Sequence, residues 1–195
     1  MSFRLGLTGS IGMGKSTTAA MFAAAGLPVW DADVAVHKLY AAGGAAVAPM
    51  TALYPAATQE GHVSRETLKA AIAADPTLLP RIESVVHPMV AADRAVFLAR
   101  TTADIAVLDI PLLFENASQS EFEATLLVTA PPALQRARVM ARPGMTEAQF
   151  SAIHARQMPD ADKRRLATHI VETLDLASTQ AYVTALIAYI RGQNA

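Results

Sequence analysis

One stretch near the start of the chain, GLTGSIGMGKSTTA at residues 6–19, constrains the fold more than any other. Its segment from Gly9 to Ser16 matches the pattern G-x-x-x-x-G-K-S/T at every fixed position. Glycines allow turns in which successive backbone N–H groups point inward at an anion, and the start of the following helix adds its positive dipole end. An apolar run precedes the glycines and a helical pattern follows them. The stretch therefore predicts a strand, a phosphate-binding loop and a helix, in that order.

Apolar runs of strand length recur along the chain. None alternates clearly between apolar and polar residues, which is typical of strands buried on both faces of a parallel sheet. Helical patterns separate these runs, so we predict an α/β fold with a doubly wound, five-stranded parallel sheet. The expected strands are residues 3–7, 27–30, 105–109, 124–128 and 169–172.

Helices are expected between these strands, and several carry their own end signals. Gly26 is suited to a C-terminal cap, and Asp75 with Pro76 is suited to the start of a helix. Thr146 and Gln149 have the spacing of a capping box. The expected helical segments are residues 15–25, 34–40, 65–73, 76–86, 89–100, 131–142, a segment starting at 146, and 178–191.

The spacing of the strands also predicts the organisation of the chain. About seventy mostly helical residues separate the second and third expected strands, which is too many for one crossover. We therefore expect a single domain over 1–195, with a helical insertion at 40–100. The other expected parts are a core formed by 1–39, 101–135 and 166–195, and a lid at 136–165.

Composition excludes several classes of function. A net charge of −1 argues against nucleic acid as a partner, and the lack of cysteine excludes disulfides and thiolate metal sites. The five histidines are scattered, so a zinc site is not expected. No apolar run is long enough to cross a membrane, and we expect a cytoplasmic protein. The basic cluster Lys163–Arg165 is suited either to a small anionic ligand or to a solvated helix face, and the solvated face is the favoured interpretation.

The glycine-rich loop provides candidates for binding a nucleoside triphosphate. Lys15 is expected to reach the β- and γ-phosphates, and the Ser16 hydroxyl to bind the Mg²⁺ that accompanies them. Asp109, which ends the apolar run at 105–109, is typical of a Walker-B-like acid that helps to hold this ion. The candidate nucleotide-binding residues are Gly12, Met13, Gly14, Lys15, Ser16 and Thr17.

Two carboxylates follow the second expected strand in the segment LPVWDAD. Asp31 and Asp33 are two residues apart, so on an extended segment they would point to the same side. The carboxyl ends of parallel strands line the ligand crevice of an open α/β sheet. Either acid is therefore a candidate for taking a proton from an acceptor hydroxyl or for holding metal-bound water. Capping the next helix is the alternative role for each of them.

Two further segments complete the candidate site. The apolar segment PLLFE, which begins at Pro111, is suited either to bury an apolar part of a ligand or simply to pack in the core. Arginines follow in LQRARVMAR, and a phosphoryl-transfer state carries charge that such a cation would stabilise. Arg142 is the first candidate because it precedes the Pro143–Gly144 turn, and Arg138 is the second.

At this point the chain resembles the dephospho-coenzyme A kinase family. The motifs GLTGSIGMGKST, DAD at 31–33, HP at 87–88 and PLLFE at 111–115 occur in the order found in that family, and RQMPDADKRR at 156–165 is similar to its C-terminal part. The resemblance implies a fold of the P-loop kinase type and transfer of the ATP γ-phosphate to the ribose 3′-hydroxyl of dephospho-coenzyme A. It covers nearly the whole chain.

The resemblance also implies roles for particular residues. Lys15, Asp33 and Arg142 would be catalytic, with Asp33 as the base and Arg142 as the lid arginine. The insertion at 40–100 would bind the acceptor. The implied substrates are ATP with Mg²⁺ and dephospho-coenzyme A, in a monomer or small homo-oligomer. The implied acceptor-binding residues are Asp31, Asp33, His87, Pro111, Leu112, Leu113 and Phe114.

The motifs allow two other interpretations. Shikimate kinases also pair such a loop with D-x-D, but they use a glycine triplet where this chain offers only Gly43 and Gly44. A regulatory nucleotide switch that binds guanine would need the patterns N-K-x-D and D-x-x-G, and neither occurs in the chain. A kinase with a hydroxyl acceptor is therefore the leading hypothesis.

Overall fold

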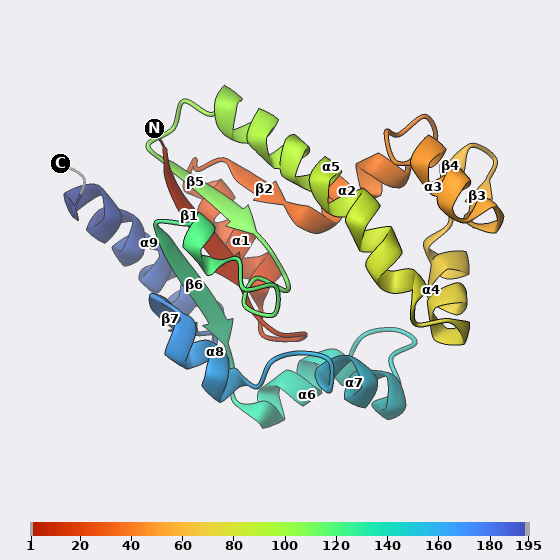
Figure 1. The fold of residues 1–195 in the computed structure, drawn as a ribbon. Helices are drawn as coiled ribbons and strands as arrows, with labels where there is room; N and C mark the ends of the chain where they lie inside the picture. Colours follow the sequence, from red (N-terminus) through yellow and green to blue (C-terminus); the bar gives the residue numbers. More distant parts are fainter. Residues whose placement is uncertain (1, 194–195) are drawn as a thin grey trace. The chain divides into compact units, whose positions relative to one another are not determined.

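A computed structural model describes residues 2–193, and it contains a five-stranded parallel sheet (Figure 1). The strand order is β2-β5-β1-β6-β7. This arrangement confirms the predicted fold class. The strands are β1 (Phe3–Thr8), β2 (Val29–Asp31), β5 (Ile105–Asp109), β6 (Ala124–Thr129) and β7 (His169–Glu172).

The chain divides into two compact units. The first, called the sheet unit below, comprises Met1–Trp30 and Thr101–Ala195. The second, called the inserted unit, is Asp31–Arg100. Among the described residues, no helix combines the length and the apolar character needed to cross a membrane.

The central strand β1 explains why the expected strands lack alternation. It pairs in parallel with β5 on one side and with β6 on the other, and all of β5 and β6 is buried. Side chains that alternate along these strands, such as Leu5, Leu7, Val107 and Val128, belong to one core cluster. Both faces of the sheet are therefore covered, and apolar residues are required at successive positions.

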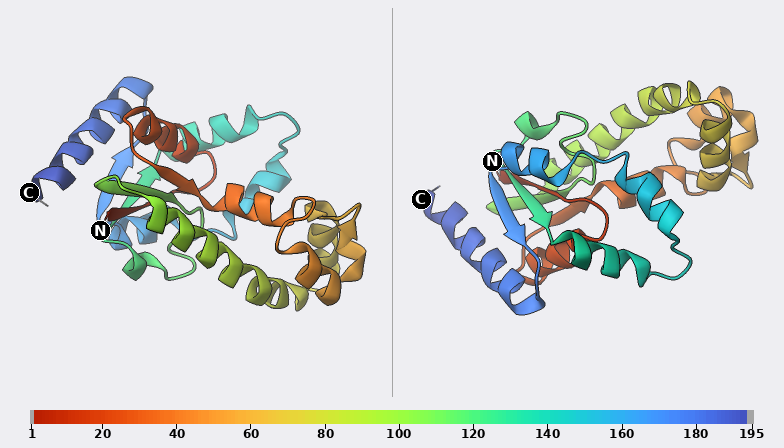
Figure 2. Two further views of the ribbon diagram at one scale, coloured as in Figure 1. Left: turned by 90° about the horizontal axis from the view of Figure 1, so that it is seen from above. Right: turned by 90° about the horizontal axis from the view of Figure 1, so that it is seen from below.

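Two helices cover the face formed by that cluster. Helix α1 (Lys15–Ala24) contributes Met21 and Phe22 to the cluster, and α9 (Leu176–Gln193) contributes Val183, Ile187 and other residues. The two helices are packed against each other (Figure 2). Gly26 has the positive φ of a residue that follows a helix end, as its position in the sequence predicts.

The opposite face is covered in part by the chain that follows β5. A side-chain carbon on Gly6 of β1 would lie 2.8 Å from Leu113 and 3.0 Å from Phe122. Glycine at this position therefore lets the two apolar side chains lie directly on the sheet. This close approach fixes the position of the segment after β5 on the sheet.

Three shorter helices connect β6 to β7: α6 (Pro132–Met140), α7 (Glu147–His154) and α8 (Asp160–Leu166). Thr146 and Gln149 form the predicted capping box at the start of α7. Helix α8 was not among the predicted helices, because its seven residues carry too little periodicity to be recognised.

The inserted unit is mainly helical and has its own apolar core, which includes Leu39, Met50, Leu68, Ile82 and Val86. A two-stranded antiparallel ribbon, formed by β3 (Thr58–Gln59) and β4 (His62–Val63), was not predicted. Two-residue strands carry no readable periodicity. The helices are α2 (Ala32–Tyr40), α3 (Val47–Leu53), α4 (Arg65–Ala74) and α5 (Leu78–Arg100), with one 3-10 turn at Pro55–Ala57.

Helix α5 corrects the prediction of two helices separated at Pro88. It is 23 residues long, begins at Leu78 rather than at Pro76, and continues through Pro88 without a break. Proline has no N–H to donate to the carbonyl of the residue four positions earlier, and this lack normally weakens a helix interior. Ile82 and Val86 before Pro88, and Met89 and Val90 after it, pack in the same core. Apolar packing on both sides of the proline therefore keeps the helix continuous.

Candidate active site

The glycine-rich loop between β1 and α1 depends on two left-handed glycines. Gly12 has φ +76° and Gly14 has φ +92°, a region that other residues rarely adopt. Space is restricted as well. A side-chain carbon at Gly12 would collide with Val139, and one at Gly14 would lie 3.0 Å from the Thr173 hydroxyl. The loop therefore needs glycine at both positions for backbone conformation and for packing.

Polar side chains from outside the motif hold the loop in place. The Gln135 amide donates to the carbonyl of Ile11 at 2.8 Å, and the Ile11 N–H donates to the Gln157 side chain at 3.1 Å. The Thr173 hydroxyl donates to the carbonyl of Met13 at 2.8 Å. These anchors satisfy backbone groups that face away from a ligand. Sequence reasoning missed them, because a glutamine in a helix gives no signal of the contact that it makes.

Lys15 and Asp109 form an ion pair within the sheet unit. Asp109 lies at the end of β5 with 1% of its surface exposed, and Lys15 is the first residue of α1. Parallel strands β1 and β5 are neighbours, so their carboxyl ends bring the loop and the acid together. The lysine predicted to bind phosphate thus lies beside the predicted Walker-B-like acid.

The oxygen atoms that Ser16 and Asp109 offer near Lys15 are suitable ligands for magnesium. Ser16, which is exposed at the start of α1, offers a hydroxyl oxygen, and Asp109 offers a carboxylate. Hard oxygen ligands are what Mg²⁺ prefers, and it commonly takes few of them from the protein and the rest from phosphates and water. In the described part of the chain no group of three or more histidine, cysteine or acidic side chains could hold a metal by itself.

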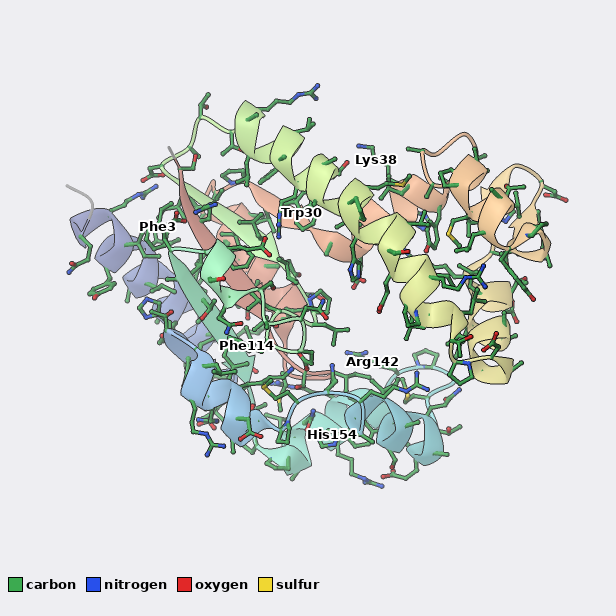
Figure 3. All side chains as sticks on the ribbon, viewed as in Figure 1. Phe3, Trp30, Lys38, Phe114, Arg142 and His154 are labelled. Carbon is green, nitrogen blue, oxygen red and sulfur yellow. The ribbon has the colours of Figure 1, made fainter. Side chains whose placement is uncertain are left out.

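A cavity of about 530 Å³ opens beside the loop, entirely within the sheet unit. Arg138 is fixed at its wall by hydrogen bonds to the Thr173 hydroxyl at 2.9 Å and the Thr173 carbonyl at 2.6 Å. Arg142, labelled in Figure 3, follows the end of α6 and also lines the cavity. The remaining lining residues are Gly12, Gly14, Thr17, Thr18, Leu174, Asp175, Leu176 and Thr179.

Asp175, which lines this cavity, directly precedes α9. Its carboxylate accepts a hydrogen bond from the Ser178 N–H at 2.8 Å. Hydrogen bonds from Ser178 to the ionised form lower the pKa of Asp175 below its usual value. The lining of the cavity thus includes one carboxylate and two arginines, so both hydrogen-bond acceptors and donors are available to a polar ligand.

The PLLFE segment proves to be divided between core and surface. Leu113 and Phe114 are buried, with 0% and 3% of their surfaces exposed, whereas Leu112 is 43% exposed. Burial therefore accounts for two of the four apolar residues that were expected to contact an acceptor (Phe114 is labelled in Figure 3). Leu112, with the half-buried Pro111, remains available to a ligand.

Glu115, the last residue of that segment, has structural partners. It accepts a hydrogen bond from the Met158 N–H at 2.9 Å, and the Lys163 ammonium lies 2.8 Å from the same carboxylate oxygen. Lys163 has none of its surface exposed. The interpretation of Lys163–Arg165 as a solvated face is therefore wrong for Lys163, because burial beside a carboxylate replaces solvation. Arg164 instead pairs with Asp160 at 2.7 Å.

The remaining predicted residues lie in the inserted unit. Asp31 is the N-cap of α2, where its side chain accepts from the Val34 N–H at 3.0 Å. Asp33 lies in the first turn of α2 and is exposed. The prediction that both acids point to one side of an extended segment is therefore wrong, because the helix starts at Ala32. His87 is exposed on α5.

Asp33 also has a partner that the sequence did not reveal. The Arg65 guanidinium, at the start of α4, donates to the backbone carbonyl of Asp33 at 3.2 Å. This contact ties the first turn of α2 to α4 and leaves the Asp33 carboxylate available.

Comparison with known proteins identifies the family. A family model described as dephospho-CoA kinase matches residues 3–177. A dephospho-CoA kinase from Cereibacter sphaeroides is 68% identical over 97% of this chain and 96% of its own length. Among solved structures, TT1252 from Thermus thermophilus is 34% identical, with a TM-score of 0.87 over 96% of this chain and 97% of its own. A dephospho-CoA kinase from Campylobacter jejuni shares the fold at 20% identity, with a TM-score of 0.73 over the full length of both chains. The chain belongs to the dephospho-CoA kinase family.

Proposed function

We propose that this protein transfers the γ-phosphate of ATP to the 3′-hydroxyl of dephospho-CoA, giving CoA and ADP. The observation that carries the proposal is the anion-binding loop with Lys15 beside Asp109, in a chain whose family match spans 3–177. A loop of backbone N–H groups at a helix start is suited to a phosphate chain. The family match favours dephospho-CoA over the shikimate-like acceptor that the sequence also allowed.

The nucleotide is assigned to the sheet unit. The loop from Gly12 to Thr17 binds the phosphates, and the cavity lined by Leu174 and Leu176 accommodates the nucleoside. Ser16 and Asp109 would hold magnesium, which when bound neutralises charge on the β- and γ-phosphates. Lys15 exchanges its contact with Asp109 for the phosphate oxygens when ATP binds.

The chemistry is a direct in-line displacement with no covalent enzyme intermediate. Asp33 accepts the proton of the acceptor hydroxyl, while Lys15 and Arg142 stabilise the charge on the transferring group. Arg138 is the weaker candidate for that last role, because its guanidinium is already held by Thr173. Positioning and neutralisation of charge supply most of the rate enhancement.

The parts of the chain are assigned as follows. The insertion at 40–100 binds the acceptor together with Pro111 and Leu112, and the segment 136–165 acts as a lid that excludes water during transfer. We also propose that the enzyme works in the cytoplasm, where its co-substrate ATP is available.

The test is release of ADP from ATP and magnesium with a panel of acceptors: dephospho-CoA, shikimate, AMP and gluconate, with a control that contains no acceptor. Turnover with dephospho-CoA alone is the expected result. Turnover with a different acceptor would retain the phosphate site and contradict the acceptor assignment. Binding of ATP without any acceptor-dependent turnover would contradict the kinase function itself.

A further inference from the structure

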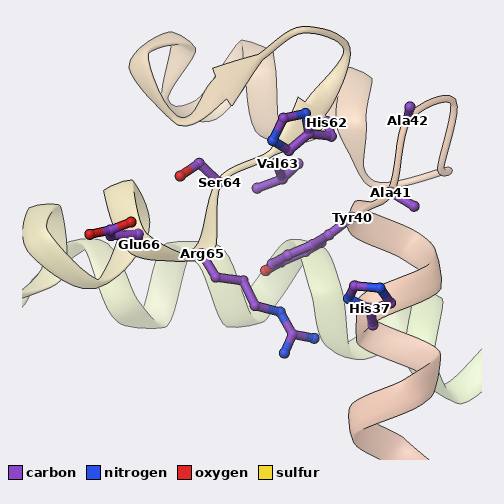
Figure 4. A pocket seen from close by; sticks show the side chains of 9 residues that line it. All are labelled: His37, Tyr40, Ala41, Ala42, His62, Val63, Ser64, Arg65 and Glu66. Atoms are coloured by element: carbon purple, nitrogen blue, oxygen red, sulfur yellow. The ribbon is translucent and has the colours of Figure 1, made fainter. Parts of the chain in front are cut away.

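A second cavity, of about 480 Å³, lies wholly within the inserted unit (Figure 4). It is formed where the end of α2, the strand β4 and the start of α4 meet. Its lining residues are His37, Tyr40, Ala41, Ala42, His62, Val63, Ser64, Arg65 and Glu66.

The polar side chains that line this cavity can all donate hydrogen bonds, except that of Glu66. Tyr40 provides a phenol that is 8% exposed, and the Arg65 guanidinium lies over its ring with 5.8 Å between Cζ and the ring centre. Two imidazoles, His37 and His62, lie on either side of the Tyr40 ring in the view of Figure 4. Glu66 also lines the cavity, but its carboxylate points away from the Arg65 guanidinium in that view. The face that contains Arg65 is therefore cationic.

Arg65 has no carboxylate partner among the residues that the structure describes. Its one hydrogen bond there goes to the carbonyl of Asp33, through Nη2 at 3.2 Å. A guanidinium has five N–H donors, so most of its hydrogen-bonding capacity remains available for a ligand. Contact with the Tyr40 ring limits its side-chain freedom, which lowers the entropy cost of binding an anion.

The contact with Asp33 relates this cavity to the reaction. Asp33 is the residue proposed to take the proton from the 3′-hydroxyl of the acceptor ribose. The same ribose carries the diphosphate on its 5′ carbon, so a ligand whose 3′-hydroxyl lies at Asp33 brings its phosphates to the neighbourhood of Asp33. At neutral pH the negative charge of dephospho-CoA is located on that diphosphate.

We propose that the cavity binds the 5′-diphosphate of the acceptor, with Arg65 as its principal cation and Tyr40 as the surface that orients the guanidinium. The proposal rests on the proposed function and specifies how the acceptor is chosen. Arginine suits the task because its planar fork pairs with two phosphate oxygens at once. The enzyme would thereby prefer acceptors with a 5′-diphosphate to nucleosides that merely offer a 3′-hydroxyl.

The experiment compares the wild type with Arg65→Gln, Arg65→Lys and the matched control Arg81→Gln. Arg81 is an exposed arginine of the same unit on α5, outside the cavity, so its loss changes the net charge of that unit equally. The KM for dephospho-CoA and the kcat are measured at saturating ATP. Adenosine, which has the 3′-hydroxyl but no phosphate, is measured as a competing inhibitor of dephospho-CoA.

For Arg65→Gln we expect the KM for dephospho-CoA to rise about ten- to a hundredfold, as for loss of a charge-assisted hydrogen-bonded pair. The inhibition constant of adenosine should stay within about twofold, because adenosine has no group for Arg65 to bind. Arg65→Lys should recover part of the affinity, since it keeps the charge without the fork. Arg81→Gln should behave as the wild type.

Four results would overturn the proposal. A KM for dephospho-CoA that rises less than about threefold in Arg65→Gln would show that no charge-assisted pair was lost. An equal rise in the KM and in the adenosine inhibition constant would show that Arg65 acts by positioning Asp33. If Arg65→Gln does not fold, a wild-type KM in Arg65→Lys would contradict the bidentate contact. A wild type that does not phosphorylate dephospho-CoA would overturn the proposed function, and this inference with it.

Discussion

Lys15 lies against a counter-charge in the structure. Asp109 is almost fully buried at the end of β5, and the ammonium of Lys15 forms an ion pair with it. Removing one partner of such a pair leaves a desolvated charge, whereas removing both is far less costly. The same side chain is therefore expected to affect both catalysis and stability, and the two effects can be separated.

We predict that Lys15→Met abolishes turnover and lowers the free energy of unfolding by about 1–3 kcal/mol, because Asp109 loses a charged partner. The double variant Lys15→Met/Asp109→Asn should regain part of that stability while remaining inactive. Urea denaturation and an ADP-release assay measure the two effects. If the double variant loses more stability than the two single variants lose together, the ion pair is not the source of the cost.

The two acids at the start of α2 allow a test of the base with a built-in control. Asp33→Asn should lower kcat about 10²- to 10⁴-fold and leave the KM for ATP nearly unchanged. Asparagine caps helices as well as aspartate does, so Asp31→Asn should keep both activity and stability, whereas Asp31→Ala should cost about 1 kcal/mol. Steady-state kinetics and thermal unfolding report these outcomes. Near-normal kcat in Asp33→Asn together with a large loss in Asp31→Asn would transfer the role of base to Asp31.

At the scale of secondary structure, the sequence predicts buried strands well and helix boundaries less well. The runs at 105–109 and 169–172 match β5 and β7 residue for residue. For β5 the reason is that a strand covered on both faces must be continuously apolar. The proline in α5 misled the prediction, since packing on both sides of Pro88 overrides its local effect. Contacts such as Gln135 to Ile11 depend on which segments meet, and residue type alone does not encode that.

Helix α5 contains two prolines in different environments, and they should respond differently to substitution. Pro88→Ala restores an N–H that can donate to the carbonyl of Ser84, so we expect the free energy of unfolding to rise by about 1–3 kcal/mol. Pro80 is the third residue of the helix, where an N–H has no intrahelical partner. Pro80→Ala should therefore change stability little. Chemical denaturation checks both, and a loss of stability in Pro88→Ala would show that the surrounding core requires the proline geometry.

For the whole molecule, the dependence of stability on pH should include a contribution from the edge strand β7. Burial lowers the pKa of His169, whose ring also contacts Tyr189 edge-on, with 5.8 Å between ring centres. Because the folded state binds this proton less readily than the unfolded chain, stability is lost as the pH falls through the ordinary histidine pKa, near 6.5. His169→Phe removes the titrating group and keeps the ring contact.

The melting temperature of His169→Phe, relative to that of the wild type, should therefore increase as the pH is lowered from 8 to 5. Near pH 8, where His169 is neutral in both the folded and the unfolded state, the difference in melting temperature between the two proteins should no longer change with pH. A constant difference across the whole range would show that this histidine makes no contribution to the pH dependence.

The order of the strands in the sheet also affects when each part of the chain can fold during synthesis. β1 is synthesised first, yet Phe3 pairs with Ile105 and Leu5 pairs with Ala124. At ribosomal rates of roughly 5–20 residues per second, this apolar strand waits roughly 5–20 s for its first neighbour in the core of the sheet. The residues from Asp31 to Arg100 are contiguous and have their own core, so they can pack during that interval. The phosphate-binding loop, although it is synthesised before most of the sheet unit, is therefore expected to be among the last parts of that unit to take its working shape.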